Sequence, residues 1–380
     1  MAPISSRRIV VGLSGGVDSS TALLLLKQQG WSPIGVSLIF PSWQHECNDK
    51  RENACCTEES FSNARRVCEK LGVPYHTYDC RKAFQKEVID YFTSELAQGR
   101  TPNPCSFCNR HVKIKSLLSY ADKHRIKYVA TGHYAKITDG GEHQTNAAGH
   151  SAKIPAKKKG ILHLVRPKDQ LKDQTYGLAL LPNKWLSRLV FPLADYEKKE
   201  VYELAIKGGF NFYNKIPQSQ DLCFVSGKAM SRFLKEKLGE KRGPIIEYGT
   251  GKELGRHDGI FHFTIGQRRG LRFPHMYFVK EFDMKKNAVI VTKDRKNLLQ
   301  NGMLVGNFNY VSGATLARST RAFIQIHPHQ KELPATITPI SPRTLSIKLD
   351  APLDGIAAGQ ICAVYKNGVC IGGGTIEKAL

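Results

Sequence analysis

Strand-like runs alternate with longer segments of helical periodicity over the first 135 residues. The strand-like runs cover 8–13, 34–40, 74–79 and 126–137, where apolar, β-branched and aromatic residues gather. The helical segments cover 19–30, 57–72, 82–99 and 108–124. This β-α-β-α order predicts a mostly parallel sheet covered by helices, with ligands bound beyond the carboxyl ends of its strands.

The pattern changes toward the C-terminus. Residues 196–240 are predicted to be largely helical, and from about Tyr277 onward short β-type runs follow one another. Asn367-Gly368 is a strong signal for a two-residue hairpin turn, and the whole series predicts a small barrel. We therefore expect an α/β catalytic domain over 1–226, a small central linker domain over 227–275 and a C-terminal β-barrel over 276–380.

Charge is the first functional signal. The 380 residues include 56 Lys and Arg against 33 Asp and Glu, a formal net charge of +23. Such an excess attracts polyanions, and nucleic acid is the expected partner. No run of 18 apolar residues is present, and the N-terminal residues lack the apolar segment of a signal peptide. We expect no membrane association and a cytoplasmic location, with an organelle matrix as the alternative.

Ten cysteines in a chain without a secretory signal favour metal, redox or catalytic use over a disulfide framework. Cys68, Cys362 and Cys370 lie in helical or hairpin patterns and are interpreted as core residues. A second group of cysteines follows the second predicted strand, and it comprises Cys47, Cys55 and Cys56. For this group a plain loop is the preferred interpretation, and a zinc site with His45 is the alternative.

The sequence SGGVDSS, residues 14–20, lies between the first predicted strand and the first predicted helix. Its small residues let backbone N–H groups approach an anion, and the helix N-terminus attracts negative charge. It matches neither a Walker A loop nor a dinucleotide fingerprint. It resembles the pyrophosphate-binding loop (PP-loop) of the N-type ATP pyrophosphatases, which implies cleavage of ATP between its α and β phosphates.

Further motifs narrow this resemblance, and they are TPNPCSFCN, ATGHYA, KDQTYGL, SQDLCFV, FTIGQRRGL and AGQICAVYKNGVCIGGGTIE. In this order they resemble the tRNA-specific 2-thiouridylases, from about Ile9 to the last residues. The resemblance implies ATP-dependent adenylation of the carbon-2 oxygen of the wobble uridine, position 34, in tRNA of the glutamate, glutamine or lysine type. Sulfur from a persulfide donor protein, a desulfurase or a relay, then replaces that oxygen.

The resemblance also assigns roles to residues. Cys223 would carry the persulfide, and Asp18 would serve the ATP chemistry. Cys108 would be the nucleophile that either attacks the persulfide to free the sulfur as hydrosulfide or helps the transfer directly, which leaves a transient Cys108–Cys223 disulfide. Cys108 should gain reactivity as a thiolate from Arg110, His111 and Lys113. Residues expected to hold ATP and Mg²⁺ are Gly12, Leu13, Ser14, Gly15, Gly16, Val17, Asp18, Ser19, Leu38 and Gly132. Residues expected to contact the target base or the tRNA are Asn103, Pro104, Cys105, His133, Lys172, Asp173, Gln174 and Gln360.

Two positions depart from the family pattern. Cys105 stands where the family commonly has an aspartate, which creates a C-x-x-C pair with Cys108. Together with Cys223 these thiols offer an alternative, an iron–sulfur cluster with an open iron for hydrosulfide. The persulfide route is the preferred hypothesis. His327 and Pro328 stand where the family uses an Arg-Tyr pair on tRNA, so the sequence leaves a tRNA contact at this place undecided.

Two other classes of function remain as alternatives. A small-molecule PP-loop enzyme such as a GMP synthetase accounts for SGGVDSS, but not for the net charge or for Cys108 with Cys223. A non-catalytic tRNA-binding protein accounts for the charge and the barrel, but not for an intact nucleotide loop.

Overall fold

Five parallel strands form the sheet of the N-terminal domain. In spatial order they are β3 (Tyr75–Asp79), β2 (Ser32–Ile39), β1 (Arg8–Gly12), β4 (Tyr128–Thr131) and β7 (Leu189–Val190). The structure is a computed structural model that describes residues 7–48, 57–139, 161–215, 222–271, 273–313 and 315–380. The four strands predicted from the sequence are present, and the two-residue β7 is an addition. The predicted parallel α/β sheet is thereby confirmed.

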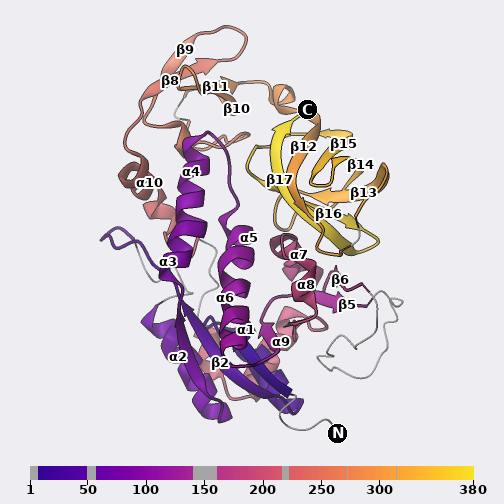
Figure 1. The fold of residues 1–380 in the computed structure, drawn as a ribbon. Coiled ribbons are helices and arrows are strands. Elements are labelled where there is room, and N and C mark those ends of the chain that lie inside the picture. The colour runs from indigo at the N-terminus through magenta and orange to yellow at the C-terminus, as the bar shows by residue number, and fades with distance from the viewer. Residues whose placement is uncertain (1–6, 49–56, 140–160, 216–221, 272, 314) are drawn as a thin grey trace.

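Helices cover both faces of this sheet because alternate strand residues point to opposite sides. Ile9 and Val11 pack with α1 (Val17–Gln28), α2 (Glu58–Leu71) and α9 (Lys198–Lys207) in one core. Val10 packs in the other core with α4 (Tyr91–Ala97) and α6 (Ile114–Lys123). Figure 1 shows α4, α5 (Pro104–Cys108) and α6 rising from the sheet toward the rest of the molecule.

Shorter elements complete the N-terminal domain. The shorter α-helices are α3 (Arg81–Phe84), α7 (Thr175–Leu178) and α8 (Asn183–Leu186). Two π-helical segments, Gln85–Asp90 and Asn109–Lys113, continue α3 and α5. The segment predicted to be largely helical, 196–240, instead contains α9, the 3₁₀ turns Asn211–Lys215 and Gly227–Ala229, and α10 (Met230–Leu238), with an irregular stretch around Cys223.

A second, four-stranded sheet forms the central domain. Its spatial order is β10 (Phe278–Asp283), β11 (Ala288–Thr292), β8 (Gly243–Glu247) and β9 (Glu253–His257). The expected boundary between residues 275 and 276 falls inside this sheet, because β10 and β11 pair with each other and β11 pairs with β8. Its small core includes Ile245, Val279 and Val291.

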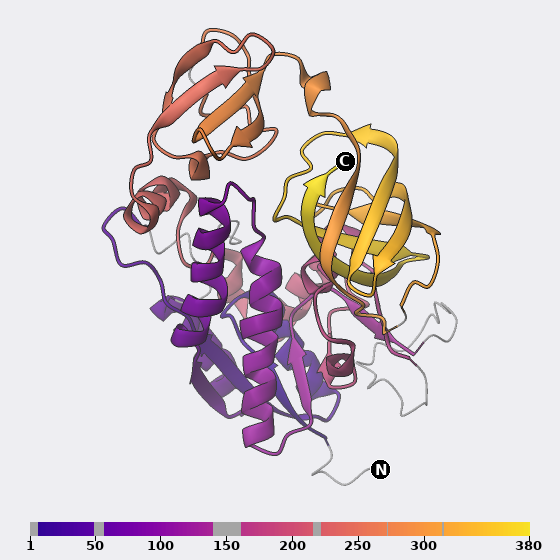
Figure 2. The same ribbon diagram turned by 45° about the horizontal axis from the view of Figure 1, so that its top comes forward.

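The C-terminal strands close into the expected barrel. In order around it they are β12 (Gln300–Asn309), β15 (Thr344–Leu353), β14 (Leu333–Ser341), β13 (Thr320–Gln325), β16 (Ile361–Lys366) and β17 (Val369–Ala379), and β12 also pairs with β17. Asn367 and Gly368 both have positive φ and join β16 to β17, as a type I′ hairpin requires. Figure 2 shows the central sheet and the barrel as separate bodies above the N-terminal domain.

The barrel is continuous with the N-terminal domain in two ways. Its sheet is extended by β6 (His163–Val165) and β5 (Lys136–Thr138), two strands that belong to the N-terminal part of the chain. The segment between them, 140–160, where the sequence predicts a surface loop, lies outside the described residues. In addition, β16 is buried on both sides: Cys362 and Val364 face the barrel core, whereas Ile361 and Tyr365 pack into the core of the N-terminal domain.

Candidate active site

The loop 13–16 joins β1 to α1 in a conformation that only small residues allow. Gly15 has φ of +76°, and a Cβ there would lie 2.2 Å from the carbonyl oxygen of Ser60. The hydroxyl of Ser19 accepts the N–H of Ser14 and donates to the carbonyl of Gly16, at 3.2 and 3.1 Å. The first turn of α1 is thereby held against the carboxyl end of the sheet, where its N–H groups favour an anion.

Gly132 closes the other side of the loop. It directly follows β4, and a Cβ at this position would lie 2.7 Å from the backbone of Asp18 and Ser19. Leu38 lies near the end of the neighbouring strand β2 and is 7% exposed. Leu38 and Gly132, the two residues expected to border the adenine, therefore lie at the ends of β2 and β4, which flank β1 and its Gly12.

The carboxylate of Asp18, in the first turn of α1, binds two side chains. The ammonium of Lys198 donates to its two oxygens at 2.6 and 2.8 Å, and the hydroxyl of Tyr134 donates at 2.9 Å. Burial, with the nearby Asp18 charge, raises the pKa of Tyr134, which therefore stays protonated as a donor. Neither partner was predicted from the sequence. Tyr134 stands inside the ATGHYA motif, but no pattern marks Lys198 in its run of charges.

The two cysteines of TPNPCSFCN begin a helix. Asn103 caps α5, because its side-chain oxygen accepts the N–H of Ser106 at 3.0 Å, and Pro104 occupies the first turn. Cys105 is exposed, and Cys108, one turn later, is only 6% exposed. Their spacing places them on neighbouring positions of one helix face.

The basic residues expected to surround Cys108 point in different directions. Arg110 donates to the carbonyl of Leu180 at 2.9 Å, and His111 lies 3.7 Å from Glu87. Lys113 lines the same pocket as Cys108. Arg110 and His111 thus each have a partner of their own, and their effect on the reactivity of Cys108 stays a prediction.

Cys223 comes from a distant segment that aromatic packing fixes. The ring of Phe224 lies 5.7–5.9 Å from the rings of Phe84, Phe92 and Phe233. The N–H of Trp43 donates to the carbonyl of Phe224 at 3.1 Å. Residues 216–221 lie outside the described residues. The buried Phe224 thus anchors a half-buried Cys223 beside it.

These elements enclose one pocket of about 420 Å³. The predicted site residues that line it are Gly12, Leu13, Ser14, Asp18, Ser19, Leu38, Pro104, Cys105, Cys108, Gly132, His133, Gln174 and Cys223. Those that do not are Gly15, Gly16, Val17, Asn103, Lys172, Asp173 and Gln360. The structure therefore brings the phosphate loop and all three cysteines to a single cavity, although Cys223 is more than 100 residues from the other two in the sequence.

His133 and Gln174 line the same pocket as the phosphate loop. The Nδ1 atom of His133 lies 2.7 Å from the hydroxyl of Thr131, and burial lowers the pKa of His133 to about 3. His133 is therefore neutral at physiological pH, so it offers hydrogen bonds and no charge. Gln174 exchanges two hydrogen bonds with the backbone of Tyr134, at 2.9 and 3.0 Å.

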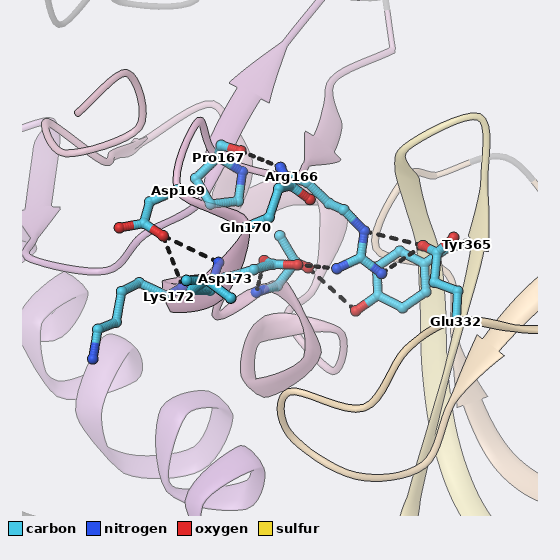
Figure 3. A network of polar contacts seen from close by, with 10 residues as sticks. Arg166, Pro167, Asp169, Gln170, Lys172, Asp173, Glu332 and Tyr365 are labelled. Atoms are coloured by element: carbon cyan, nitrogen blue, oxygen red, sulfur yellow. Dashed lines mark hydrogen bonds and ion pairs between the residues drawn. The ribbon is translucent and has the colours of Figure 1, made fainter. Parts of the chain in front are cut away.

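Asp173 lies outside the pocket, in a network that Figure 3 shows. Its carboxylate, 6% exposed, pairs with the guanidinium of Arg166 and accepts the N–H of Thr175 at 2.8 Å. The side chain of Lys172 extends away from this network. Arg166 was not predicted from the sequence, because it lies outside the quoted motifs and no residue pattern marks it.

Gln360 belongs to the barrel but lies beside the segment that leads to α5. The preceding Gly359 approaches Thr101 so closely that a Cβ would lie 2.9 Å from its N atom, and the N–H of Thr101 donates to Ala358 at 2.7 Å. The side-chain oxygen of Gln360 is buried and has no hydrogen-bond partner within the described residues. His327, at the position of the family's Arg-Tyr pair, is exposed at the far end of β13.

The described residues of this site form no group of metal ligands. Within the part of the chain that the structure describes, no three His, Cys, Asp or Glu side chains are grouped so that they could hold a metal ion. Cys105, Cys108 and Cys223 thus share a pocket without forming a ligand set for a cluster. Cys47 is exposed, and Cys55 and Cys56 lie outside the described residues.

Three further cysteines lie in the core, and the described helices are not of a membrane-spanning kind. Cys68, Cys362 and Cys370 are fully buried, as predicted, and burial raises the pKa of Cys68 to about 12. Over the described ranges, no helix has the length and apolar character needed to cross a membrane.

Comparison with known proteins gives three matching family models, described as the tRNA methyl transferase HUP domain (residues 7–227), the tRNA methyl transferase PRC-barrel domain (231–293) and the aminomethyltransferase beta-barrel domain (300–376). Among curated proteins, the tRNA-specific 2-thiouridylase MnmA of Roseiflexus castenholzii is 37% identical over 98% of this chain and 99% of its own length. The proteins of the same name from Clostridioides difficile and Aquifex aeolicus are 36% and 37% identical, over 99% and 98% of this chain and 99% of their own lengths.

Proposed function

This chain belongs to the family of tRNA-specific 2-thiouridylases, which are ATP-using tRNA sulfurtransferases, and from that premise we propose its reaction. The chain adenylates the carbon-2 oxygen of uridine 34 in tRNA of the glutamate, glutamine or lysine type and replaces that oxygen by sulfur. One observation carries the proposal: the phosphate loop, Cys108 and Cys223 line the same pocket.

In the first step, the carbon-2 oxygen of the flipped-out uridine attacks the α-phosphorus of ATP, and pyrophosphate leaves. Binding of the phosphates is supported by Leu13, Ser14, Asp18 and Ser19, which line the pocket at the N-terminal, partly positive end of α1. No carboxylate other than that of Asp18 lines the pocket within the described residues. The carboxylate of Asp18 would hold Mg²⁺, which would offset negative charge on the phosphates. Neutral His133 contacts the tRNA through hydrogen bonds.

In the second step, sulfur is transferred. The terminal sulfur of a persulfide on Cys223 bonds to carbon 2, and AMP leaves with the former carbon-2 oxygen. The thiolate of Cys108 then attacks the Sγ atom of Cys223, and the bond between that Sγ atom and the transferred sulfur breaks. The transferred sulfur gains two electrons, and Cys108 and Cys223 lose them by forming a disulfide. A dithiol reductant restores the two thiols, and a persulfide donor protein reloads Cys223. Both cysteines line the pocket as thiols, which supports this route.

The cluster route receives less support, because Cys105, Cys108 and Cys223 are not grouped as metal ligands among the described residues. A small-molecule PP-loop enzyme would leave the barrel and the tRNA-contact positions without a role. A protein that modifies tRNA acts where tRNA is held, so we propose the cytoplasm as its location, with an organelle matrix as the alternative.

The test is thiolation by iron-free protein. Protein shown to contain no iron is incubated with unmodified glutamate tRNA, ATP, Mg²⁺ and a persulfide donor, and 2-thiouridine is quantified by nucleoside mass spectrometry. We expect thiolation by the wild type and by Cys105→Ser, and none by Cys108→Ser or Cys223→Ser. Because all three are the same substitution in the same pocket, Cys105→Ser is the matched control. Thiolation that requires a rebuilt cluster and is lost in Cys105→Ser would overturn the persulfide route, and no thiolation under either condition would overturn the function.

A further inference from the structure

Arg166 lies where the chain passes from the barrel sheet to the KDQTYGL motif. It directly follows β6, whose residues Leu164 and Val165 pair with β17, and its own N–H donates to the carbonyl of Gly368 at 3.3 Å. From Arg166 the chain enters the turn 169–173 and then the short helix α7. The backbone of Arg166 is therefore attached to the barrel, while the segment that follows carries residues proposed to contact tRNA.

The guanidinium of Arg166 joins partners from both domains, as Figure 3 shows. On one side it pairs with Asp173. On the other side it binds Glu332, which precedes β14, with Nε at 3.0 Å, and it stacks 4.0 Å above the ring of Tyr365 in β16. The hydroxyl of Tyr365 lies 3.2 Å from that of Thr175, which closes the connection. One side chain thus connects two barrel elements with the start of α7.

The turn itself is fixed at its other end. One oxygen of Asp169 accepts the N–H groups of Leu171 and Lys172 at 3.0 and 3.2 Å, and its second oxygen accepts the N–H of Lys198 at 2.9 Å. Asp173, at the end of the turn, is held by Arg166 and Thr175. The backbone of Lys172 is therefore rigidly placed while its side chain extends away from the network.

The chemistry of this contact requires an arginine. The side chains of Arg166, Asp173 and Glu332 are 17%, 6% and 30% exposed, so the ion pairs are largely shielded from water. A planar guanidinium binds two carboxylates along its edges while its face stacks on an aromatic ring, and a lysine ammonium cannot reproduce both contacts.

We propose that Arg166 is a positioning residue for tRNA recognition: it docks the barrel onto the turn 169–173 and so fixes the relative placement of Gln360 on the barrel and Lys172 and Gln174 on the catalytic domain. These positions then form two binding sites whose relative placement is fixed before one tRNA binds to both. The inference rests on the proposed function, because it concerns how the same substrate is held. It assigns Arg166 no contact with ATP or with the reacting atoms.

The test compares Arg166→Lys, Glu332→Gln and their double variant with Arg188→Lys. Arg188 is the matched control, since it is also partly buried, pairs with Asp122 and donates to a backbone carbonyl, but lies away from the barrel and the pocket. For each protein, the Kd for unmodified glutamate tRNA, the KM and kcat of thiolation, the affinity for a non-hydrolysable ATP analogue and the thermal midpoint are measured.

We expect Arg166→Lys and Glu332→Gln each to raise the Kd and KM for tRNA about tenfold, because each removes one side of a coupled contact. The double variant should be no worse than Arg166→Lys, since the two residues act as a unit. The kcat at saturating tRNA and the affinity for the ATP analogue should stay within about twofold of wild type, as should every parameter of Arg188→Lys.

Unchanged tRNA Kd and KM in Arg166→Lys would overturn the inference. The inference would also be overturned if the effects of the two substitutions on the tRNA Kd added in the double variant, because the two residues would then act independently. Equal losses of affinity for tRNA and for the ATP analogue would overturn it too, because they would indicate general destabilisation. If the wild type makes no 2-thiouridine, the proposed function fails. The direct tRNA Kd then still decides the role of Arg166, so the two failures are distinguishable.

Discussion

The ammonium of Lys198 lies 2.6 Å from one carboxylate oxygen of Asp18 and 2.8 Å from the other. Lys198 begins α9, and Asp18 stands in the first turn of α1, 180 residues earlier. The Lys198 side chain is 14% exposed, so this ion pair fixes the first turn of α1 from a largely buried position. The same carboxylate is the acidic group proposed to act on ATP and Mg²⁺, and its structural and chemical roles must be separated by experiment.

Asp18→Ala should abolish thiolation and leave tRNA affinity within about twofold, because Asp18 lies in the ATP part of the pocket. It should also lower the free energy of unfolding by about 1–2 kcal/mol, because the largely buried Lys198 ammonium loses a carboxylate partner that is itself 35% exposed. Adding Lys198→Met should restore most of that stability and none of the thiolation. Nucleoside mass spectrometry, filter binding and urea unfolding measure the three effects. A fully active Asp18→Ala protein would contradict the proposed role of Asp18 in adenylation.

Gly15→Ala should lower the free energy of unfolding by about 1–3 kcal/mol and abolish binding of an ATP analogue, since φ is +76° and the new Cβ would meet Ser60. Gly16→Ala is the matched control. Its φ is −92°, and the nearest atom to a new Cβ is 3.5 Å away, so its stability should be unchanged. Thermal unfolding and calorimetric titration test the pair, and equal effects at both positions would contradict the conformational argument.

Cys105 should react with iodoacetamide at least about tenfold faster than Cys108 in the absence of tRNA, because Cys105 is exposed and Cys108 is buried. Fragment-ion mass spectrometry separates the two sites within one tryptic peptide. Fully buried Cys362 serves as an internal control that should stay unmodified until the protein unfolds. Faster modification of Cys108 would show that the described placement of α5 is not the one that dominates in solution.

His133 should make stability fall as the pH falls below about 6.5. Burial lowers the pKa of folded His133 to about 3, so between these values the unfolded chain binds a proton that the folded chain does not. The free energy of unfolding should therefore be about 2 kcal/mol lower at pH 5 than at pH 7.5. Above the pKa of the unfolded state, both states hold a neutral His133, so no stability is lost there. Urea unfolding of wild type and His133→Gln at both pH values should show a shallower pH dependence in the variant. Equal pH dependence would mean that His133 titrates normally.

Affinity for tRNA should fall steeply with salt, because the chain carries a formal net charge of +23. Each neutralised phosphate releases counterions, and we expect the logarithm of the binding constant to fall against the logarithm of salt concentration with a slope of about 4 or more in magnitude. Filter binding from 50 to 300 mM KCl, roughly the range where this effect is large, measures the slope. Salt-independent binding would count against recognition dominated by phosphates.

Local patterns were sufficient where neighbouring residues decide the outcome. The continuous apolar run in 8–13 predicts a strand, and it is continuous because both sides of that strand are covered by helices. The glycines after the strand predict a tight phosphate loop, because a larger side chain at Gly15 would clash. The Asn367-Gly368 turn follows from the positive φ that a two-residue hairpin needs. The domain boundary was less accessible, since the pairing of β11 with β8 joins segments more than 40 residues apart.

The sequence by itself therefore determined the parallel sheet, the loop that begins α1, the identity of the thiols and the family resemblance. Only the tertiary structure decided which side chains meet: Lys198 with Asp18, Arg166 with Glu332 of the barrel, and Cys223 with Cys108 in one pocket. It also decided that Arg110 donates to the carbonyl of Leu180 and that His111 lies beside Glu87. The physical reason is that propensity and periodicity act over a few residues, whereas a buried ion pair or a shared cavity depends on how distant segments pack.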